Sequence, residues 1–263
     1  MSNVHMPPEA EKRLTSPLFT SDLSVNEFAV LQHAGFAPLG LVMGNSVYHI
    51  GIQTNSAWQN QELTVITSAM QNARTLAMDR MLEEAHRLSA DGIVGLRLEA
   101  GLAKWGESLA DFMAVGTAVR GSDGQRYKVT RGAQELPFTS ALSGQDLWTL
   151  RQTGYRPVGL VMGNCVYHVA HQGFLQSLRT LGRNTEMTHF SQALYNAREI
   201  AMSRMQAEAS RLGASGIVGV QVREDSFSWD LHIIEFFAIG TAVVPLEGQN
   251  NRLIPQPTLD LGR

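Results

Sequence analysis

Two histidines and one cysteine are the residues of this sequence that offer the most direct chemistry, as metal ligands or as a nucleophile with a base. His49 and His168 end two near-identical ten-residue segments, and Cys165 precedes His168 by three positions. Residues three apart on a β-strand point to opposite faces, so Cys165 and His168 do not converge on one metal ion. The chain has no CxxC or HxxxH spacing. If a divalent metal binds, His49 and His168 are its candidate ligands; hydrogen bonding of these histidines to the backbone is the favoured alternative.

Cys165 lies in an apolar segment, Val161–Tyr167. A reactive cysteine needs a lowered pKa and a nearby base, whereas a thiol buried in an apolar strand is inert. The matching position of the first segment holds Ser46, so the thiol is not shared by both segments. We predict a structural role for Cys165, and a single cysteine is typical of a reducing compartment.

Two carboxylates occur in otherwise apolar strand-like segments, at Asp111 and Glu235. Carboxylates are costly to bury unless they are paired, and Arg74 and Arg198 are candidate partners. A structural or inter-subunit salt bridge is favoured over an acidic ring that lines a channel. All four residues are therefore candidates for an interface or a channel.

Trp105 and Trp229 occupy equivalent positions at a predicted hairpin tip. Large aromatic side chains are enriched at protein interfaces. We predict a subunit contact at these tryptophans, with stacking on a ligand as the alternative.

The sequence segments that would position these residues occur twice in the chain. Gly40–His49 recurs as Gly159–His168 at an offset of 119 residues, and Asn72–Arg74 recurs as Asn196–Arg198 at an offset of 124. Such a repeat indicates two copies of one unit and an association between copies. The predicted organisation is a flexible N-terminal arm over residues 1–17, a first unit over 18–120, a linker over 121–137, a second unit over 138–244 and a proline-containing tail over 245–263.

Each unit is predicted to contain a short helix, a strand, a long helix and two further strands. Ser24 and Ser143 are placed as N-caps of the short helices. The long helix is indicated by an alanine-rich apolar stripe at steps of three and four. The stripe consists of Ile66, Met70, Ala73, Ala77, Met81, Ala85 and Leu88 in the first copy and Phe190, Leu194, Ala197, Ala201, Met205, Ala209 and Leu212 in the second.

Charged residues beside this stripe stand four positions apart, as Arg80 with Glu84 and as Arg204 with Glu208. This spacing predicts ion pairs on the outer, solvated face of each helix. The glycines that follow, Gly92 and Gly216, are predicted to end the long helices. Glycines inside the first strand, such as Gly44 and Gly163, fit a bulge or a close approach better than a nucleotide-binding loop.

The last strand of each unit carries apolar side chains on both faces. In the first unit, Phe112 and Ala114 point one way, whereas Met113 and Val115 point the other way. One long helix covers only one face of a sheet. The sister unit or further chains are therefore expected to cover the second face.

These ordered motifs resemble the YbjQ-like family, which is labelled as heavy-metal-binding. The motifs include Ala197–Met202, Glu208–Val220 and Phe237–Val243. The resemblance covers residues 36–120 and 155–244 and implies a dodecin/YbjQ-like α+β fold: two tandem β-α-β-β units, each a small three-stranded sheet packed on one long helix. It also implies closed rings, typically of five units, and no established enzyme activity. Members usually carry one unit, so the size of a ring built from tandem units does not follow.

Composition narrows the functional classes. The chain of 263 residues is 44% hydrophobic and 17% charged, with a net charge of −3. So little charge on small units indicates that surface is hidden by association, and the absence of a basic stripe argues against nucleic acid or anionic membrane as partners. No apolar run is long enough to span a membrane, and no signal-peptide pattern is present, so we expect a cytoplasmic protein.

We predict a non-enzymatic assembly protein that forms a homo-oligomeric ring and binds or scaffolds a partner protein. The alternative is a ring that binds a metal ion or a small ligand with donors from several subunits. A hydrolase or transferase with His and Asp across the repeat contact is the least favoured class, because no nucleophile accompanies them.

Overall fold

The computed structural model describes residues 6–16, 18–50, 59–102, 109–122, 124, 127–131, 134–170, 188–226 and 233–246. The first half contains helices α1 (Pro8–Leu14), α2 (Val25–His33) and α3 (Thr64–Arg87) and strands β1 (Phe36–His49), β2 (Gln61–Glu62), β3 (Gly92–Leu102) and β4 (Leu109–Gly121). Strands β5 (Val129–Arg131) and β6 (Gln134–Leu136) form an antiparallel pair between the units. The second half contains β7 (Phe138–Thr139), α4 (Gly144–Gln152), β8 (Tyr155–His168), α6 (Thr188–Arg211), β9 (Gly216–Ser226) and β10 (Ile233–Pro245). The predicted α+β class is confirmed.

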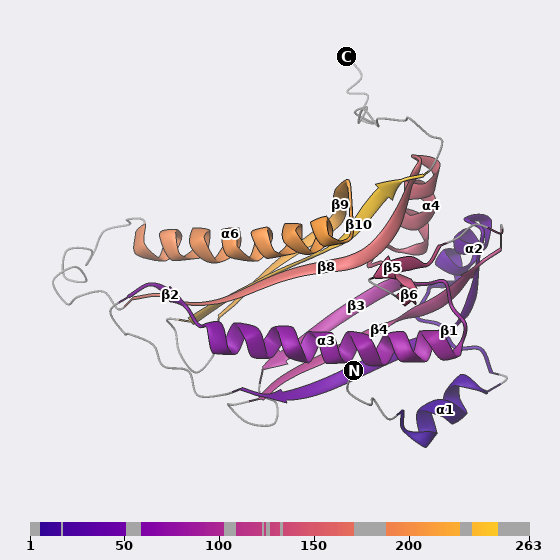
Figure 1. Ribbon diagram of the computed structural model, residues 1–263, viewed down its shortest axis with the longest axis horizontal. Coiled ribbons are helices and arrows are strands. Elements are labelled where there is room, and N and C mark those ends of the chain that lie inside the picture. Colours follow the sequence, from indigo (N-terminus) through magenta and orange to yellow (C-terminus); the bar gives the residue numbers. More distant parts are fainter. Residues whose placement is uncertain are drawn as a thin grey trace, which may run out of the picture.

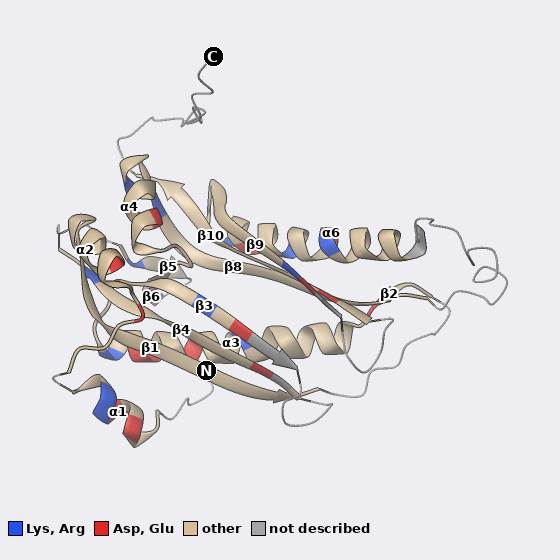
Figure 2. Ribbon diagram, turned by 180° about the vertical axis from the view of Figure 1, so that it is seen from behind, with Lys and Arg blue, Asp and Glu red and all other residues tan. Residues whose placement is uncertain are grey.

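Helix α6 covers one face of the second sheet, and α3 packs against the other face (Figure 1). The strands of the first sheet run behind α3 in Figure 1, and the two sheets also meet directly where Phe112 stacks on Phe237. Strands β8 and β10 carry few charged residues over their length (Figure 2). Apolar strand faces of this kind require a covering layer on each side.

Each unit contributes a strand to the sheet of the other unit. The strand orders are β1-β4-β3-β7 and β2-β8-β10-β9, so β7 of the second unit joins the first sheet and β2 of the first unit joins the second sheet. We expected three strands in each sheet, and this expectation is wrong. The fourth strand comes from the neighbouring unit, which the sequence of one unit does not reveal.

The alanine stripe lets each long helix lie close against its own sheet. Ala73 and Ala77 are fully buried in the first unit, as are Ala197 and Ala201 in the second. A Cβ atom added at Gly44 would lie 2.6 Å from the backbone nitrogen of Met81. The prediction that two backbones approach closely at this glycine is confirmed, because the backbones of helix α3 and strand β1 leave no room for a side chain.

The predicted N-caps of the short helices are confirmed. The Ser24 hydroxyl accepts a hydrogen bond from the Glu27 amide, and the Glu27 carboxylate accepts one from the Ser24 amide, which together form a capping box. The Ser143 hydroxyl accepts from the Asp146 amide in the same way.

The predicted ends of the long helices at Gly92 and Gly216 are wrong, because both glycines begin strands. Helix α3 ends at Arg87 instead, and Ser89 takes the left-handed conformation with φ of 53°. Its counterpart after α6 is Gly213, with φ of 67°. This conformation ends many helices and favours glycine. Because the first unit has a serine here, its sequence lacks the glycine that would mark the end of the helix.

Within the predicted N-terminal arm, Pro8–Leu14 form helix α1, and the flexibility of the arm stays a prediction. A proline in its first turn, acidic residues at Glu9 and Glu11 and basic residues at Lys12 and Arg13 suit the helix dipole. No residue of α1 is buried. The helix contacts the first unit through Arg13, through Glu11 and through Leu14, which packs against the core.

Candidate functional site

The contact between the two units is the most elaborate polar and apolar site of the described chain. Strand β7 lies parallel to β3, with Gly92 opposite Phe138. The amide of Phe138 donates to the carbonyl of Asp91 at 3.1 Å, and the amide of Ser140 donates to the carbonyl of Ile93 at 2.9 Å. The second unit thereby completes the edge of the first sheet through main-chain bonding.

Phe138 fills a space beside Gly92. Its ring is fully buried, and a Cβ atom at Gly92 would clash with it. The segment that carries Phe138 is also tied to its own unit, because the Ala141 amide donates to the Thr241 hydroxyl at 3.0 Å. Gly92 is therefore a glycine because a neighbouring unit inserts an aromatic ring there.

The reverse contribution comes from residues at and just after β2. The amide of Leu63 donates to the carbonyl of Val166 at 2.8 Å, and the amide of Val166 donates to the hydroxyl of Thr67 at 3.1 Å. The free edge of β8 is covered in this way. Helix α3, which follows, covers the face of the second sheet that carries Phe237 and Ile239. The prediction that a sister unit covers this second face is confirmed for the second unit.

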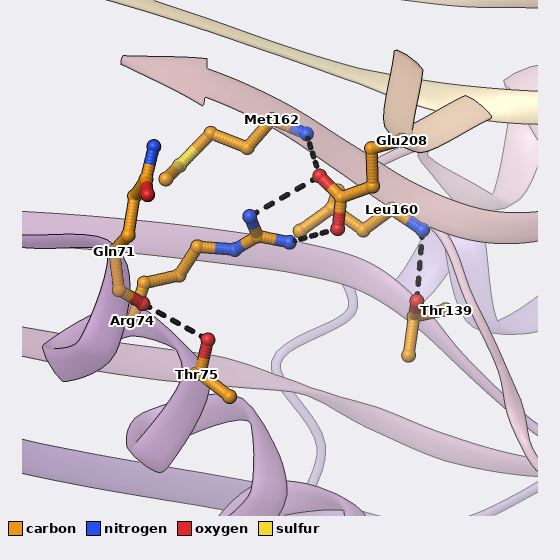
Figure 3. A network of polar contacts seen from close by, with 7 residues as sticks. All are labelled: Gln71, Arg74, Thr75, Thr139, Leu160, Met162 and Glu208. Atoms are coloured by element: carbon orange, nitrogen blue, oxygen red, sulfur yellow. Dashed lines mark hydrogen bonds and ion pairs between the residues drawn. The ribbon is translucent and has the colours of Figure 1, made fainter. Parts of the chain in front are cut away.

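An arginine–glutamate pair links the two long helices around the edge of β8 (Figure 3). The guanidinium of Arg74 on α3 donates to both carboxylate oxygens of Glu208 on α6, at 2.6 and 3.2 Å. Glu208 also accepts from the amide of Met162 at 2.8 Å. Thr139 closes the same edge, because its hydroxyl accepts from the Leu160 amide at 2.8 Å. A bidentate ion pair of this kind fixes both the distance and the relative orientation of the guanidinium and the carboxylate.

A second pair crosses the contact at the other end of β8. Arg204 on α6 donates to both carboxylate oxygens of Glu62 on β2, at 2.6 and 3.0 Å. The hydrogen bond with Glu62 raises the pKa of Arg204. Beside this pair, burial and the negative charge of Glu62 raise the pKa of Cys165 to about 12, with Arg204 acting in the opposite direction. Cys165 is fully buried, as expected for a structural thiol.

The helix charges that were expected to pair on a solvated face bind other elements of the fold instead. Glu84 is buried and binds Arg13, and Glu208 binds Arg74, so neither carboxylate pairs with the arginine four residues before it on its helix. Arg204 pairs with Glu62, and Arg80 bonds the carbonyl of Asn45. A spacing of four residues predicted ion pairs within each helix. Contacts with other elements form in their place.

The two candidate metal ligands differ in environment. His168 is almost fully buried and its Nδ1 lies 3.2 Å from the carbonyl oxygen of Gln59, whereas His49 is exposed at the end of β1. Within the described residues, no group of three or more His, Cys, Asp or Glu side chains is placed to hold a metal ion. The metal role of these histidines stays a prediction.

The other candidate residues are only partly brought together. Arg74 lies at the contact but binds Glu208 and not Asp111, so the predicted partner is wrong. Arg198 is exposed, binds Glu199 at 2.9 Å and stacks on Tyr195. One carboxylate oxygen of Asp111 is buried without a hydrogen-bond partner among the described residues. The interface or channel role of Asp111 and Glu235 stays a prediction; Trp105 and Trp229 lie outside the described residues.

Surfaces that are buried at this contact reappear, exposed, at the two outer ends of the chain. Val166 is fully buried, but its equivalent Val47 is 57% exposed; Phe138 is fully buried, but its equivalent Phe19 is 49% exposed. The same holds at the other end, where Leu98 is buried and the equivalent Val222 is 50% exposed. Each unit therefore has both halves of the contact, and the chain uses only one half of each.

The order of units, the helix–strand packing and the repeated motifs agree with a family match over residues 29–122 and 151–245. The family is YbjQ, described as "Putative heavy-metal-binding". The chain belongs to this family. Two units of the YbjQ family thus stand in tandem.

A protein of Mycobacterium tuberculosis named as an encapsulin nanocompartment protein is 51% identical over 249 residues, which are 92% of this chain and 93% of that protein. A UPF0145 protein of Halorubrum lacusprofundi is 40% identical over 87 residues, and one of Pseudothermotoga lettingae is 37% identical over 87. These matches span 31% of this chain but 82% and 80% of those proteins. None of these names states an enzymatic activity. Among the described helices, none has the length and apolarity to cross a membrane.

Proposed function

We propose that this YbjQ-family chain is a non-enzymatic assembly protein that associates head to tail with copies of itself into a closed ring. The observation that carries the proposal is the paired exposure just described: the contact buried inside the chain is repeated, uncovered, at both of its ends. Apolar side chains such as Val47 and Phe19 are then exposed only in an isolated chain.

The internal contact is heterologous, because the two units present different surfaces to each other. The first unit offers its β3 edge and helix α3, and the second offers its β7 segment and the outer face of its sheet. Repetition of a heterologous contact gives a ring when the rotation closes and a filament when it does not. A ring of whole chains contains an even number of units, so a ring of five units is incompatible with this tandem chain.

Open ends of the required kind support the proposal. Strand β9 is the edge strand of the second sheet: it pairs with β10 on one side, and no described strand pairs with its other side. A groove of about 500 Å³ lies between β9 and the end of α6, lined by residues that include Met202, Ala214 and Gly216. The equivalent region of the first unit, around Ala90 and Gly92, is buried beneath the β7 segment of the second unit. The matching segment of another chain, around Phe19, suits the open groove.

Native mass spectrometry of the full chain, with elemental analysis of the same sample, tests this function. We expect one closed species with a whole number of chains and no stoichiometric metal. A monomer at micromolar concentration would refute self-association. A stoichiometric metal that is lost from a His49→Ala/His168→Ala variant would favour the alternative function, a metal-binding ring.

We further propose that the assembly acts in the cytoplasm with a protein nanocompartment. This step is supported by the name of the 51% identical relative, whose match covers nearly the whole of both chains. Co-expression with the encapsulin shell protein of the same organism, followed by size-exclusion chromatography and cryo-electron microscopy, tests it. Separate elution of the two proteins at high ionic strength and at physiological ionic strength would refute it.

A further inference from the structure

We propose that Arg13 of α1 stands in for Arg198 of a neighbouring chain at Glu84, so that α1 must leave before the first unit can accept that neighbour. The inference rests on the proposed head-to-tail assembly and adds a built-in competitor to it.

Glu84 and Glu208 are the same site in the two units. Glu208 accepts from the Met162 amide at 2.8 Å, and Glu84 accepts from the Met43 amide at 2.9 Å. Both carboxylates therefore cap the free edge of the first strand of their sheet from the long helix behind it. Each also binds one arginine from another element of the fold.

The two arginines come from different sources. At Glu208 the arginine is Arg74, from the long helix of the preceding unit. At Glu84 it is Arg13, whose guanidinium donates to the carboxylate at 2.5 Å and to the carbonyl of Leu41 at 2.6 Å. Helix α1 lies beside β1 and the end of α3 (Figure 1), because Arg13 reaches both Leu41 of β1 and Glu84 of α3.

The arginine that corresponds to Arg74 in the second unit is Arg198. It lies on the outer surface of α6, 44% exposed, where it binds its neighbour Glu199 and stacks on the Tyr195 ring. Exposed ion pairs of this kind contribute little and exchange readily. Head-to-tail docking of two chains would bring Arg198 of one chain to Glu84 of the next, because Arg74 and Glu208 already make that contact within the chain.

Helix α1 is attached loosely enough to be displaced. None of its residues is buried, and its second ion pair, Arg87 with Glu11, is exposed and 3.6 Å long. A cavity of about 210 Å³ remains between the α1 segment and the start of β1, lined by residues that include Leu14 and Leu39. An element with few buried contacts opens at low free-energy cost. Release of α1 costs the Arg13 contacts and the packing of the half-buried Leu14 against the core.

The test compares the full chain with Arg13→Gln, Arg198→Gln and a form that lacks residues 1–16. Assembly is followed by sedimentation velocity at a urea concentration where the unsubstituted chain is half assembled. We expect Arg13→Gln and the shortened chain to assemble at about tenfold lower protein concentration, and Arg198→Gln at about tenfold higher, as for one charge-assisted contact that is partly exposed. Amide exchange of residues 10–15 should be faster in the assembly than in the free chain.

The outcomes separate the two proposals. If Arg198→Gln weakens assembly but Arg13→Gln and the shortened chain behave like the unsubstituted chain, α1 does not compete and the inference is overturned, while the assembly proposal stands. Unchanged protection of residues 10–15 in the assembly overturns it as well. If every form, the shortened chain included, stays monomeric at high concentration, the head-to-tail assembly itself fails.

Discussion

Gly216 offers a sharp test of the head-to-tail contact, because a ring of the neighbouring unit fills the space beside its equivalent, Gly92. A Cβ atom at Gly92 would clash with the buried ring of Phe138. At Gly216 the nearest atom to an added Cβ is Cγ2 of Val243, 3.8 Å away, which is an ordinary contact. Gly216→Ala should therefore leave the isolated chain intact, with an unfolding free energy unchanged or raised by up to ~1 kcal/mol through the less flexible unfolded chain.

Assembly should suffer from the same substitution, because Phe19 of the next chain would need the space. Full burial of a Phe side chain is worth about 1.5–3 kcal/mol, and Phe19 is already half covered. The remaining burial, roughly 1–1.5 kcal/mol, and about 1–1.5 kcal/mol from a displaced main-chain hydrogen bond add up to about 2–3 kcal/mol. At 1.4 kcal/mol per tenfold, association should weaken roughly 30- to 140-fold.

Sedimentation velocity over a dilution series measures this shift, and urea unfolding below the assembly midpoint measures the stability of the chain. Gly92→Ala is the matched control: it should destabilise the chain itself by about 1–3 kcal/mol, because Phe138 has no room to move in a packed core. Assembly of Gly216→Ala at the same concentration as the unsubstituted chain would refute the reasoning. So would equal losses of chain stability in the two variants.

Other substitutions test the remaining contacts. Arg74→Gln should lower the unfolding free energy by about 2 kcal/mol in urea, since the Glu208 carboxylate loses a two-pronged partner; a change below ~0.5 kcal/mol would contradict this. Cys165→Ser should cost less than about 1 kcal/mol at pH 7, because the equivalent Ser46 donates to the Ala73 carbonyl. The folded-state pKa of Cys165 is raised to about 12, so the contribution of the thiol to the free energy of unfolding is full below pH 9 and is lost as the pH rises toward 12. If the difference in unfolding free energy between the unsubstituted chain and Cys165→Ser stays constant over this range, the burial of the thiol is contradicted. Joint substitution of His49 and His168 by Asn should leave the assembled mass unchanged, and native mass spectrometry would detect a loss.

Several features of the fold were predictable because they depend on local sequence. The alanine stripe of α3, the capping box at Ser24 and the close-approach role of Gly44 each follow from neighbours within a few turns or from one strand. The apolar character of both strand faces also predicted that a further layer must cover the sheet. Helix α1 was missed, because a single seven-residue helix without an apolar stripe has no periodic signal.

The candidate site was harder to predict, and the helix charges show why. Glu84 and Glu208 have the spacing of exposed intrahelical pairs, yet both reach the edge of a strand and bind an arginine from another element. Spacing along one helix reports only the neighbours on that helix. The partners Arg13 and Arg74 lie 71 and 134 residues away in the chain, and no local pattern connects them.

The sequence by itself determined that the chain holds two copies of one unit, because the same motifs recur in the same order and with similar spacing. It also determined the packed face of each long helix, through the period of the apolar residues. Only the tertiary structure decided how the copies meet: which strands they exchange, which glycine accepts a neighbour's ring and which arginine reaches which glutamate. The physical reason is that a heterologous contact joins two different surfaces of the same unit. Both surfaces are present in each copy of the sequence, and only the fold shows which are covered and which are left open.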